Sequence, residues 1–166
     1  MLTVLFTGAL LVAVGLIYFR NADFVSGPVR LVGSHARSFT LPATHGPNLG
    51  IASERGSIVV LNLWASWCPP CRAEMPDLQR FWLAQRTHGV VVIGVDEGES
   101  ATAATTFARA LGVTYPILVD SDQRYGRVYS ALGLPTTTVI DRNGIVRAAF
   151  DGPVTESQLA VAIHGL

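Results

Sequence analysis

The most reactive side chains of this sequence are two cysteines separated by two prolines. Cys68 and Cys71 are the only cysteines among the 166 residues. A thiolate is the attacking species in thiol–disulfide exchange, and a second thiol about one helical turn away can reach back and release a mixed disulfide. The pair therefore predicts a redox-active dithiol that cycles through a Cys68–Cys71 disulfide.

The segments on either side of the pair favour a reactive thiolate. The apolar run 58–63 predicts a buried central strand before Cys68, and the stretch after the second cysteine has helical spacing. A thiol at a helix N-terminus faces unpaired backbone N–H groups, which stabilise the thiolate. Pro69 and Pro70 suit a first helical turn, although their missing N–H groups also remove donors to the Cys68 sulfur.

Three other uses of a cysteine pair are disfavoured. A structural zinc site needs two further ligands, and the four histidines of the chain show no metal-binding spacing. Attachment of a c-type haem needs a histidine directly after the second cysteine, where this chain has Arg72. A structural disulfide at this spacing closes a short loop and adds little stability. The sequence therefore predicts neither a metal nor a bound cofactor.

Predicted strands and helices alternate along the rest of the chain. Asn143-Gly144 indicates a hairpin turn between the last two strands. The alternation predicts an α/β sandwich, with a parallel sheet extended by this antiparallel hairpin. The predicted strands are 38–42, 49–52, 58–63, 90–95, 117–119, 136–140 and 145–150, and the predicted helices are 72–88, 102–111, 123–132 and one that begins at Thr155.

The N-terminal segment is uninterruptedly uncharged from residue 2 to residue 19. As a helix this segment would be roughly 27 Å long, close to the hydrocarbon thickness of a bilayer. We expect residues 1–20 to form an uncleaved transmembrane helix, 21–37 a linker and 38–166 one globular domain. The 12 basic residues balance the 12 acidic ones, which gives no support to nucleic-acid binding.

Two separated motifs together resemble the thioredoxin superfamily: Trp67-Cys68-Pro69-Pro70-Cys71 and Gly133-Leu134-Pro135-Thr136-Thr137. Further matching pieces are similar to the membrane-anchored, extracytoplasmic TlpA/ResA/CcmG-like branch. The resemblance covers about residues 39–163 and implies a thioredoxin-like three-layer sandwich with a mixed central sheet. The further pieces are 61–68, 72–76, 95–100 and 141–144.

The same resemblance implies roles for individual residues. Cys68 is implied to be the exposed nucleophile, and Cys71 the buried resolving thiol. The peptide bond before Pro135 is implied to be cis, with this proline facing the dithiol and keeping metal from the cysteines. The residues implied to shape the substrate-binding face are Trp67, Pro69, Pro70, Leu134 and Pro135.

Three acidic positions and one amide extend this interpretation. Glu74 matches an acidic residue of the family that tunes the thiols and relays a proton, although a glutamate is also an ordinary first-turn helix residue. Asn62 stands where cytosolic thioredoxins carry an aspartate, and an amide cannot relay a proton. Glu97 and Glu99 match an acidic loop of the family, but a solvated loop is the expected environment for both.

The resemblance implies a monomeric thiol–disulfide oxidoreductase on the periplasmic side of the bacterial cytoplasmic membrane, which reduces or exchanges disulfides of protein substrates. Implied substrates are apocytochrome c or copper-delivery proteins, and the implied electron donor is a membrane protein. Thiol peroxidase is an alternative, disfavoured because Leu61 and Ala65 replace the proline and threonine of that site. A Sco-like copper chaperone is another, whose cysteines are spaced one residue wider and joined by a distant histidine.

Overall fold

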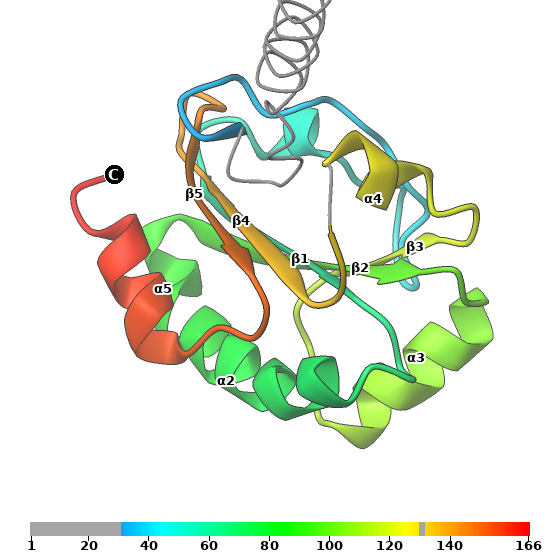
Figure 1. The fold of residues 1–166 in the computed structure, drawn as a ribbon. Coiled ribbons are helices and arrows are strands. Elements are labelled where there is room, and N and C mark those ends of the chain that lie inside the picture. Colours follow the sequence, from blue (N-terminus) through cyan, green and yellow to red (C-terminus); the bar gives the residue numbers. More distant parts are fainter. Residues whose placement is uncertain (1–30, 130–131) are drawn as a thin grey trace, which may run out of the picture.

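A computed structural model gives the structure of residues 31–129 and 132–166 (Figure 1). The predicted transmembrane helix, residues 1–20, and the first part of the predicted linker lie outside these described residues. Within the described ranges no helix has the length and apolar character needed to cross a membrane.

The core of the fold is a five-stranded mixed sheet in the order β3-β2-β1-β4-β5. Its members are β1 (Ile58–Trp64), β2 (Val90–Glu97), β3 (Ile117–Asp120), β4 (Thr136–Ile140) and β5 (Val146–Asp151). β1, β2 and β3 are parallel, whereas β4 is antiparallel to both β1 and β5. The predicted mixed sheet, with a C-terminal hairpin at its edge, is therefore confirmed.

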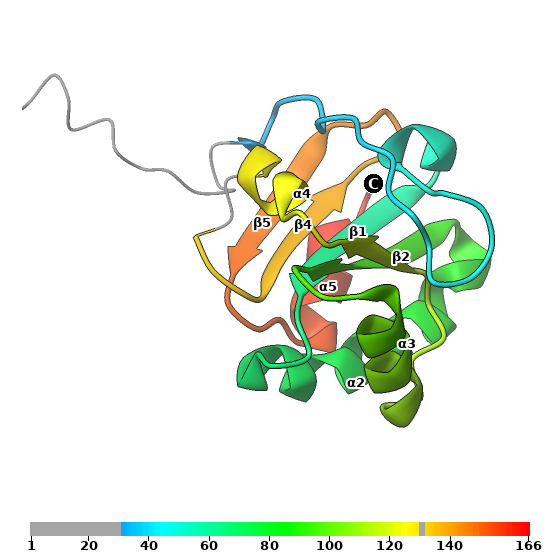
Figure 2. The same cartoon turned by 90° about the vertical axis from the view of Figure 1, so that its right-hand side faces the viewer.

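Helices cover both faces of this sheet, which makes the three layers of a thioredoxin-like fold (Figures 1 and 2). One face carries α2 (Pro69–Gln85), α3 (Ala101–Ala110) and α5 (Glu156–Ile163). The other carries α4 (Arg124–Val128) and the short 3-10 helix η2 (Ile51–Glu54). A second 3-10 turn, η3 (Arg86–His88), follows α2.

Strand β1 is buried along its whole length because both of its faces are covered. Its side chains alternate between two hydrophobic clusters. Val60 and Trp64 pack in the cluster that contains α2, while Leu61 and Leu63 pack on the α4 side. Asn62 falls on the α2 side by the same alternation. The strand thus places a polar side chain beneath the helix that carries the dithiol.

The segment before β1 differs from the prediction of two edge strands at 38–42 and 49–52. Only isolated bridges form there, Leu41 with Leu49 and Ala43 with Leu118, and the residues after Gly50 turn into η2. This segment packs on the sheet through single buried residues, such as Leu41 and Ile51. It does not show the alternation of buried and exposed side chains that is typical of a strand.

Two further boundaries differ from the sequence prediction. Helix α4 spans Arg124–Val128 and is therefore shorter than the predicted 123–132 helix. Gln123, the residue before it, has a positive φ of 53° and is not helical. The described part of the predicted linker packs on the domain, since Leu31 is buried and the Gly33 N–H donates to the carbonyl of Val146.

Gly126 is required by the packing of α4 against β2. A Cβ at this position would lie 2.0 Å from Oε1 of the buried Glu97. We expect Gly126→Ala to lower the free energy of unfolding by about 1–3 kcal/mol through overpacking, despite the better helix propensity of alanine. Urea denaturation measures the loss. Gly133→Ala is the control, because open space surrounds that position; an equal or larger loss there would contradict the packing argument.

Candidate active site

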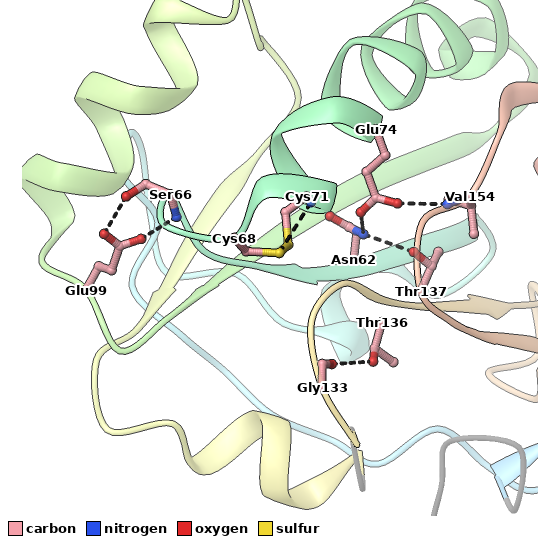
Figure 3. Close-up of a disulfide and its surroundings, with 10 residues drawn as sticks. All are labelled: Asn62, Ser66, Cys68, Cys71, Glu74, Glu99, Gly133, Thr136, Thr137 and Val154. Atoms are coloured by element: carbon pink, nitrogen blue, oxygen red, sulfur yellow. Dashed lines mark hydrogen bonds between the residues drawn. A yellow bond between two sulfur atoms is a disulfide. The ribbon is translucent and has the colours of Figure 1, made fainter.

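The dithiol lies where β1 leads into α2, as the sequence predicts. Cys68 is the N-cap residue of α2, and Pro69 and Pro70 occupy its first two positions. The structure contains the Cys68–Cys71 disulfide, with an S–S distance of 2.03 Å (Figure 3). The backbone N–H of Cys71 points at the Cys68 sulfur, 3.3 Å away. The positive end of the helix therefore faces the sulfur that is predicted to carry the thiolate.

The burial of the two cysteines departs from the expectation of an exposed nucleophile. In this disulfide form Cys68 is only 3% exposed and Cys71 is fully buried. The reason is that the bond ties Cys68 to a sulfur inside the hydrophobic cluster under α2. Trp67 is 64% exposed, as expected for a platform beside the dithiol, and the two prolines between the cysteines are exposed as well.

The loop before β4 lies at the same edge of the sheet as the dithiol. Thr136 pairs with Leu63 near the end of β1, so the residue before Thr136 lies close to where β1 leads into the cysteines. The Leu134–Pro135 peptide bond is cis, as the resemblance implied. The Thr136 hydroxyl donates to the carbonyl of Gly133 at 2.8 Å and closes this turn (Figure 3).

Glu74 lies on α2 three residues after Cys71 and is only 3% exposed. Its Oε1 accepts from Nδ2 of Asn62 and its Oε2 from the backbone N–H of Val154, each at 2.8 Å. Burial raises the pKa of Glu74 to about 7, against the lowering effect of these two hydrogen bonds. A group with this pKa can both take up and release a proton near neutral pH.

Asn62 connects Glu74 to the neighbouring strand. Its Nδ2 donates to Glu74 and also to the hydroxyl of Thr137 on β4, at 2.9 Å. Figure 3 shows this side chain between the disulfide and Glu74. Its Oδ1 is buried and has no hydrogen-bond partner in the part of the chain that the structure describes. Glu74 is thus fixed from β1 and from the segment before α5.

Glu97 and Glu99 are not in a solvated loop as expected: Glu97 is the last residue of β2, and Glu99 lies two residues beyond it. Glu97 is buried, and burial together with the charge of Asp120 raises its pKa. Glu99 is half-buried and accepts two hydrogen bonds from Ser66, two residues before the nucleophile. The sequence did not predict the contact between Glu99 and Ser66, because these residues are 33 positions apart and neither loop carries a pattern that indicates the other.

Comparison with known proteins shows the family to which this chain belongs. The model of the AhpC/TSA family matches residues 32–149. The thiol-disulfide oxidoreductase ResA of Bacillus subtilis is 33% identical over 155 residues, covering 92% of this chain and 87% of that protein. The chain belongs to the AhpC/TSA family and is related to the ResA thiol-disulfide oxidoreductases. ResA of Geobacillus kaustophilus is also 33% identical, over 90% of this chain and 86% of that protein.

Solved structures show the same fold. StoA from Bacillus subtilis superposes with a TM-score of 0.67 and 27% identity, covering 76% of this chain and 96% of that one. A thioredoxin family thiol:disulfide interchange protein from Chlorobium tepidum has a TM-score of 0.70 and 27% identity, covering 78% and 92%. Together with the Cys68–Cys71 disulfide, these relatives identify the protein as a thiol–disulfide oxidoreductase.

Proposed function

We propose that Cys68 is the attacking thiolate, Cys71 the resolving thiol and Glu74 the group that takes the Cys71 proton. The observation that carries this assignment is the buried Glu74 carboxyl, one helical turn from Cys71 and with a pKa near 7. Its hydrogen bonds to Asn62 and to the Val154 N–H hold it on the dithiol side of the sheet. The alternative of an ordinary first-turn glutamate does not apply, because α2 begins at Pro69 and has no acidic residue in its first turn.

The reaction proceeds in two exchanges. The Cys68 thiolate attacks one sulfur of the substrate disulfide, which breaks that bond and releases the first substrate thiolate. Cys71 then loses its proton to Glu74 and attacks the Cys68 sulfur of the mixed disulfide. The second substrate thiolate leaves, and the Cys68–Cys71 disulfide remains. Two electrons pass from the dithiol to the substrate, and a reduced donor must return them by the reverse exchange.

The substrate surface in this proposal consists of an exposed part and a second part in which Leu134 is half-buried and Pro135 is buried. One is Trp67 with Pro69 and Pro70, all of which face solvent. The other is the loop that carries Leu134 and the cis Pro135, which lies at the same end of the sheet. An extended substrate segment can lie between the two, with its disulfide over Cys68.

We further propose that the domain works on the periplasmic side of the bacterial cytoplasmic membrane as a monomer anchored by residues 1–20. The uncharged run from residue 2 to residue 19 supports an anchor. Anchoring would hold the domain near a membrane electron donor at high effective concentration. The proposed substrates are the haem-site cysteines of apocytochrome c or the cysteines of a copper-delivery protein.

The proposal predicts that the reduced full-length protein reduces a peptide disulfide of the Cys-x-x-Cys-His type found at haem sites. We expect stoichiometric formation of two peptide thiols and one Cys68–Cys71 disulfide, followed by mass spectrometry after acid quenching. A disulfide peptide from a copper-delivery protein is the parallel substrate. Reduction of oxidised glutathione without reduction of either peptide would rule out these substrates while leaving the oxidoreductase activity in place.

A further inference from the structure

A carboxylate from the loop after β2 holds the turn that precedes the nucleophile. Oε2 of Glu99 accepts from the backbone N–H of Ser66 at 2.6 Å, and Oε1 accepts from the Ser66 hydroxyl at 2.7 Å (Figure 3). Hydrogen bonds to an ionised acceptor are roughly twice as strong as neutral ones. The turn of Ser66 and Trp67 connects β1 to the N-cap residue Cys68. Glu99 therefore fixes the chain directly before the reacting sulfur.

A second carboxyl group lies behind Glu99. Asp96 is fully buried on β2, beside Trp64 of β1 in the sheet register. Apart from Glu99, neither of its oxygens has a hydrogen-bond partner in the described part of the chain. The carboxylate of Glu99 lies against it and opposes its ionisation, and the carboxylate of Glu97, on the opposite face of β2, acts in the same direction. The backbone N–H of Glu99 favours the ionised form, but burial and the two carboxylates outweigh it. A buried carboxyl beside a carboxylate is stable in the protonated form, which can donate to Glu99.

We propose that Glu99 is a positioning residue for thiol–disulfide exchange, and that protonated Asp96 keeps its carboxylate on Ser66. Glu99 does not touch the sulfurs; it sets the turn that orients Trp67 and Cys68. Protonated Asp96 supports Glu99 because it donates a hydrogen bond to the Glu99 carboxylate, whereas an ionised Asp96 would repel it. The inference rests on the oxidoreductase activity alone and is independent of the substrates and the proton acceptor proposed above.

The charge states of the pair agree with this arrangement. Burial raises the pKa of Glu99, but the hydrogen bonds from Ser66 outweigh burial and hold that pKa below its usual value. Burial, followed by the neighbouring Glu99, raises the pKa of Asp96 to about 8. Asp96 is therefore protonated at neutral pH and ionises in mild alkali. Its ionisation places two like charges next to each other and weakens the hold on Ser66.

The kinetic test measures the second-order rate constant of the reduced full-length protein with oxidised glutathione. We expect Glu99→Ala to lower this constant about tenfold, because a misplaced reacting group reacts more slowly. Glu99→Gln should restore it to within about twofold, since an amide can accept from the Ser66 N–H and donate to its hydroxyl. Glu54→Ala is the matched control, because Glu54 belongs to η2, before the opposite end of β1.

The spectroscopic test follows the Ser66 amide proton by NMR in the oxidised protein, where the cysteines do not titrate. We expect a downfield amide signal that moves upfield with a midpoint near the Asp96 pKa of about 8. Asp96→Asn should remove this transition, and Glu99→Ala should move the signal upfield at every pH. If the substitutions acted only by destabilising the fold, Glu99→Gln would not restore the exchange rate. Asp96→Asn would then not specifically remove the pH-dependent transition of the Ser66 signal.

Two outcomes overturn the inference. One is an unchanged exchange rate in Glu99→Ala at neutral pH, which would show that the Ser66 turn needs no support. The other is a Ser66 amide signal that does not depend on pH in the wild type, or whose transition persists in Asp96→Asn. The second result would assign the titration to another group, with Glu97 as the nearest on β2.

Discussion

Replacement of Cys68 by serine is expected to abolish disulfide exchange, with a loss of more than about a thousandfold in the rate constant. A serine hydroxyl is not ionised near neutral pH, so the helix N-terminus has no thiolate to stabilise. Cys71 cannot substitute for it, because Cys71 is fully buried behind Cys68. The measurement is the initial rate of reduction of oxidised glutathione by the reduced variant.

Cys71→Ser separates the two steps of the same reaction. The first attack by Cys68 should proceed at close to the wild-type rate, since the N-cap position and its backbone donor remain. Turnover should stop after one equivalent, because no thiol is left to release the mixed disulfide. Multiple turnovers by Cys71→Ser would contradict the assignment of a resolving role. Full activity of Cys68→Ser would overturn the site itself.

The second large effect is expected from Glu74→Gln and concerns the resolving step. A carboxylate with a pKa near 7 accepts the Cys71 proton at neutral pH, whereas an amide cannot. We expect release of the mixed disulfide to slow about a hundredfold at neutral pH, with the first attack little changed. Rapid-quench kinetics with mass detection resolves the two steps. An unchanged pH–rate profile for release would exclude Glu74 as the proton acceptor.

The same substitution should flatten the dependence of stability on pH. The pKa of Glu74 is about 7 in the folded protein, above the value of 4.5 expected in the unfolded chain. The folded state therefore holds this proton more tightly, and its stabilising effect is lost as pH rises from about 4.5 to about 7. The wild type should lose about 3 kcal/mol across this window through Glu74, and Glu74→Gln should not.

Urea denaturation of the oxidised protein at both ends of the window measures this effect, because the cysteines do not titrate in that form. The control is Glu156→Gln, which changes a carboxylate of α5 whose side chain is 46% exposed. It should leave the pH dependence as in the wild type. Equal slopes for the wild type and Glu74→Gln would show that burial does not shift this carboxyl.

Each strand of the observed sheet overlaps a predicted one. β1, β2 and β3 could be predicted because a strand covered on both faces is a continuous apolar segment. β4 and β5 are more polar, and the Asn143-Gly144 turn signal between them indicated the hairpin. The segment 38–52 was mispredicted because tertiary contacts of single residues, such as Leu41 and Ile51, decide its path. No periodicity in the sequence records such contacts.

The candidate site divides in the same way. The dithiol at a helix N-terminus follows from adjacent residues, and the resemblance supplied Glu74 and the cis Pro135. The sequence did not indicate that Glu74 would be fully enclosed, because its partner Val154 lies 80 residues away. The sequence likewise did not indicate the hydrogen bonds that Glu99 accepts from Ser66. Contacts between distant loops arise only once the sheet brings the loops to one edge.

The central claim is that Cys68 attacks a substrate disulfide and Cys71 completes the exchange. The most direct measurement is intact-mass and peptide-mapping mass spectrometry of full-length Cys71→Ser after incubation with a disulfide peptide. The account predicts one stable adduct per chain, linked through Cys68, and no adduct on Cys68→Ser under the same conditions. An adduct on Cys71 of the Cys68→Ser protein, with none on Cys68 of Cys71→Ser, would contradict it.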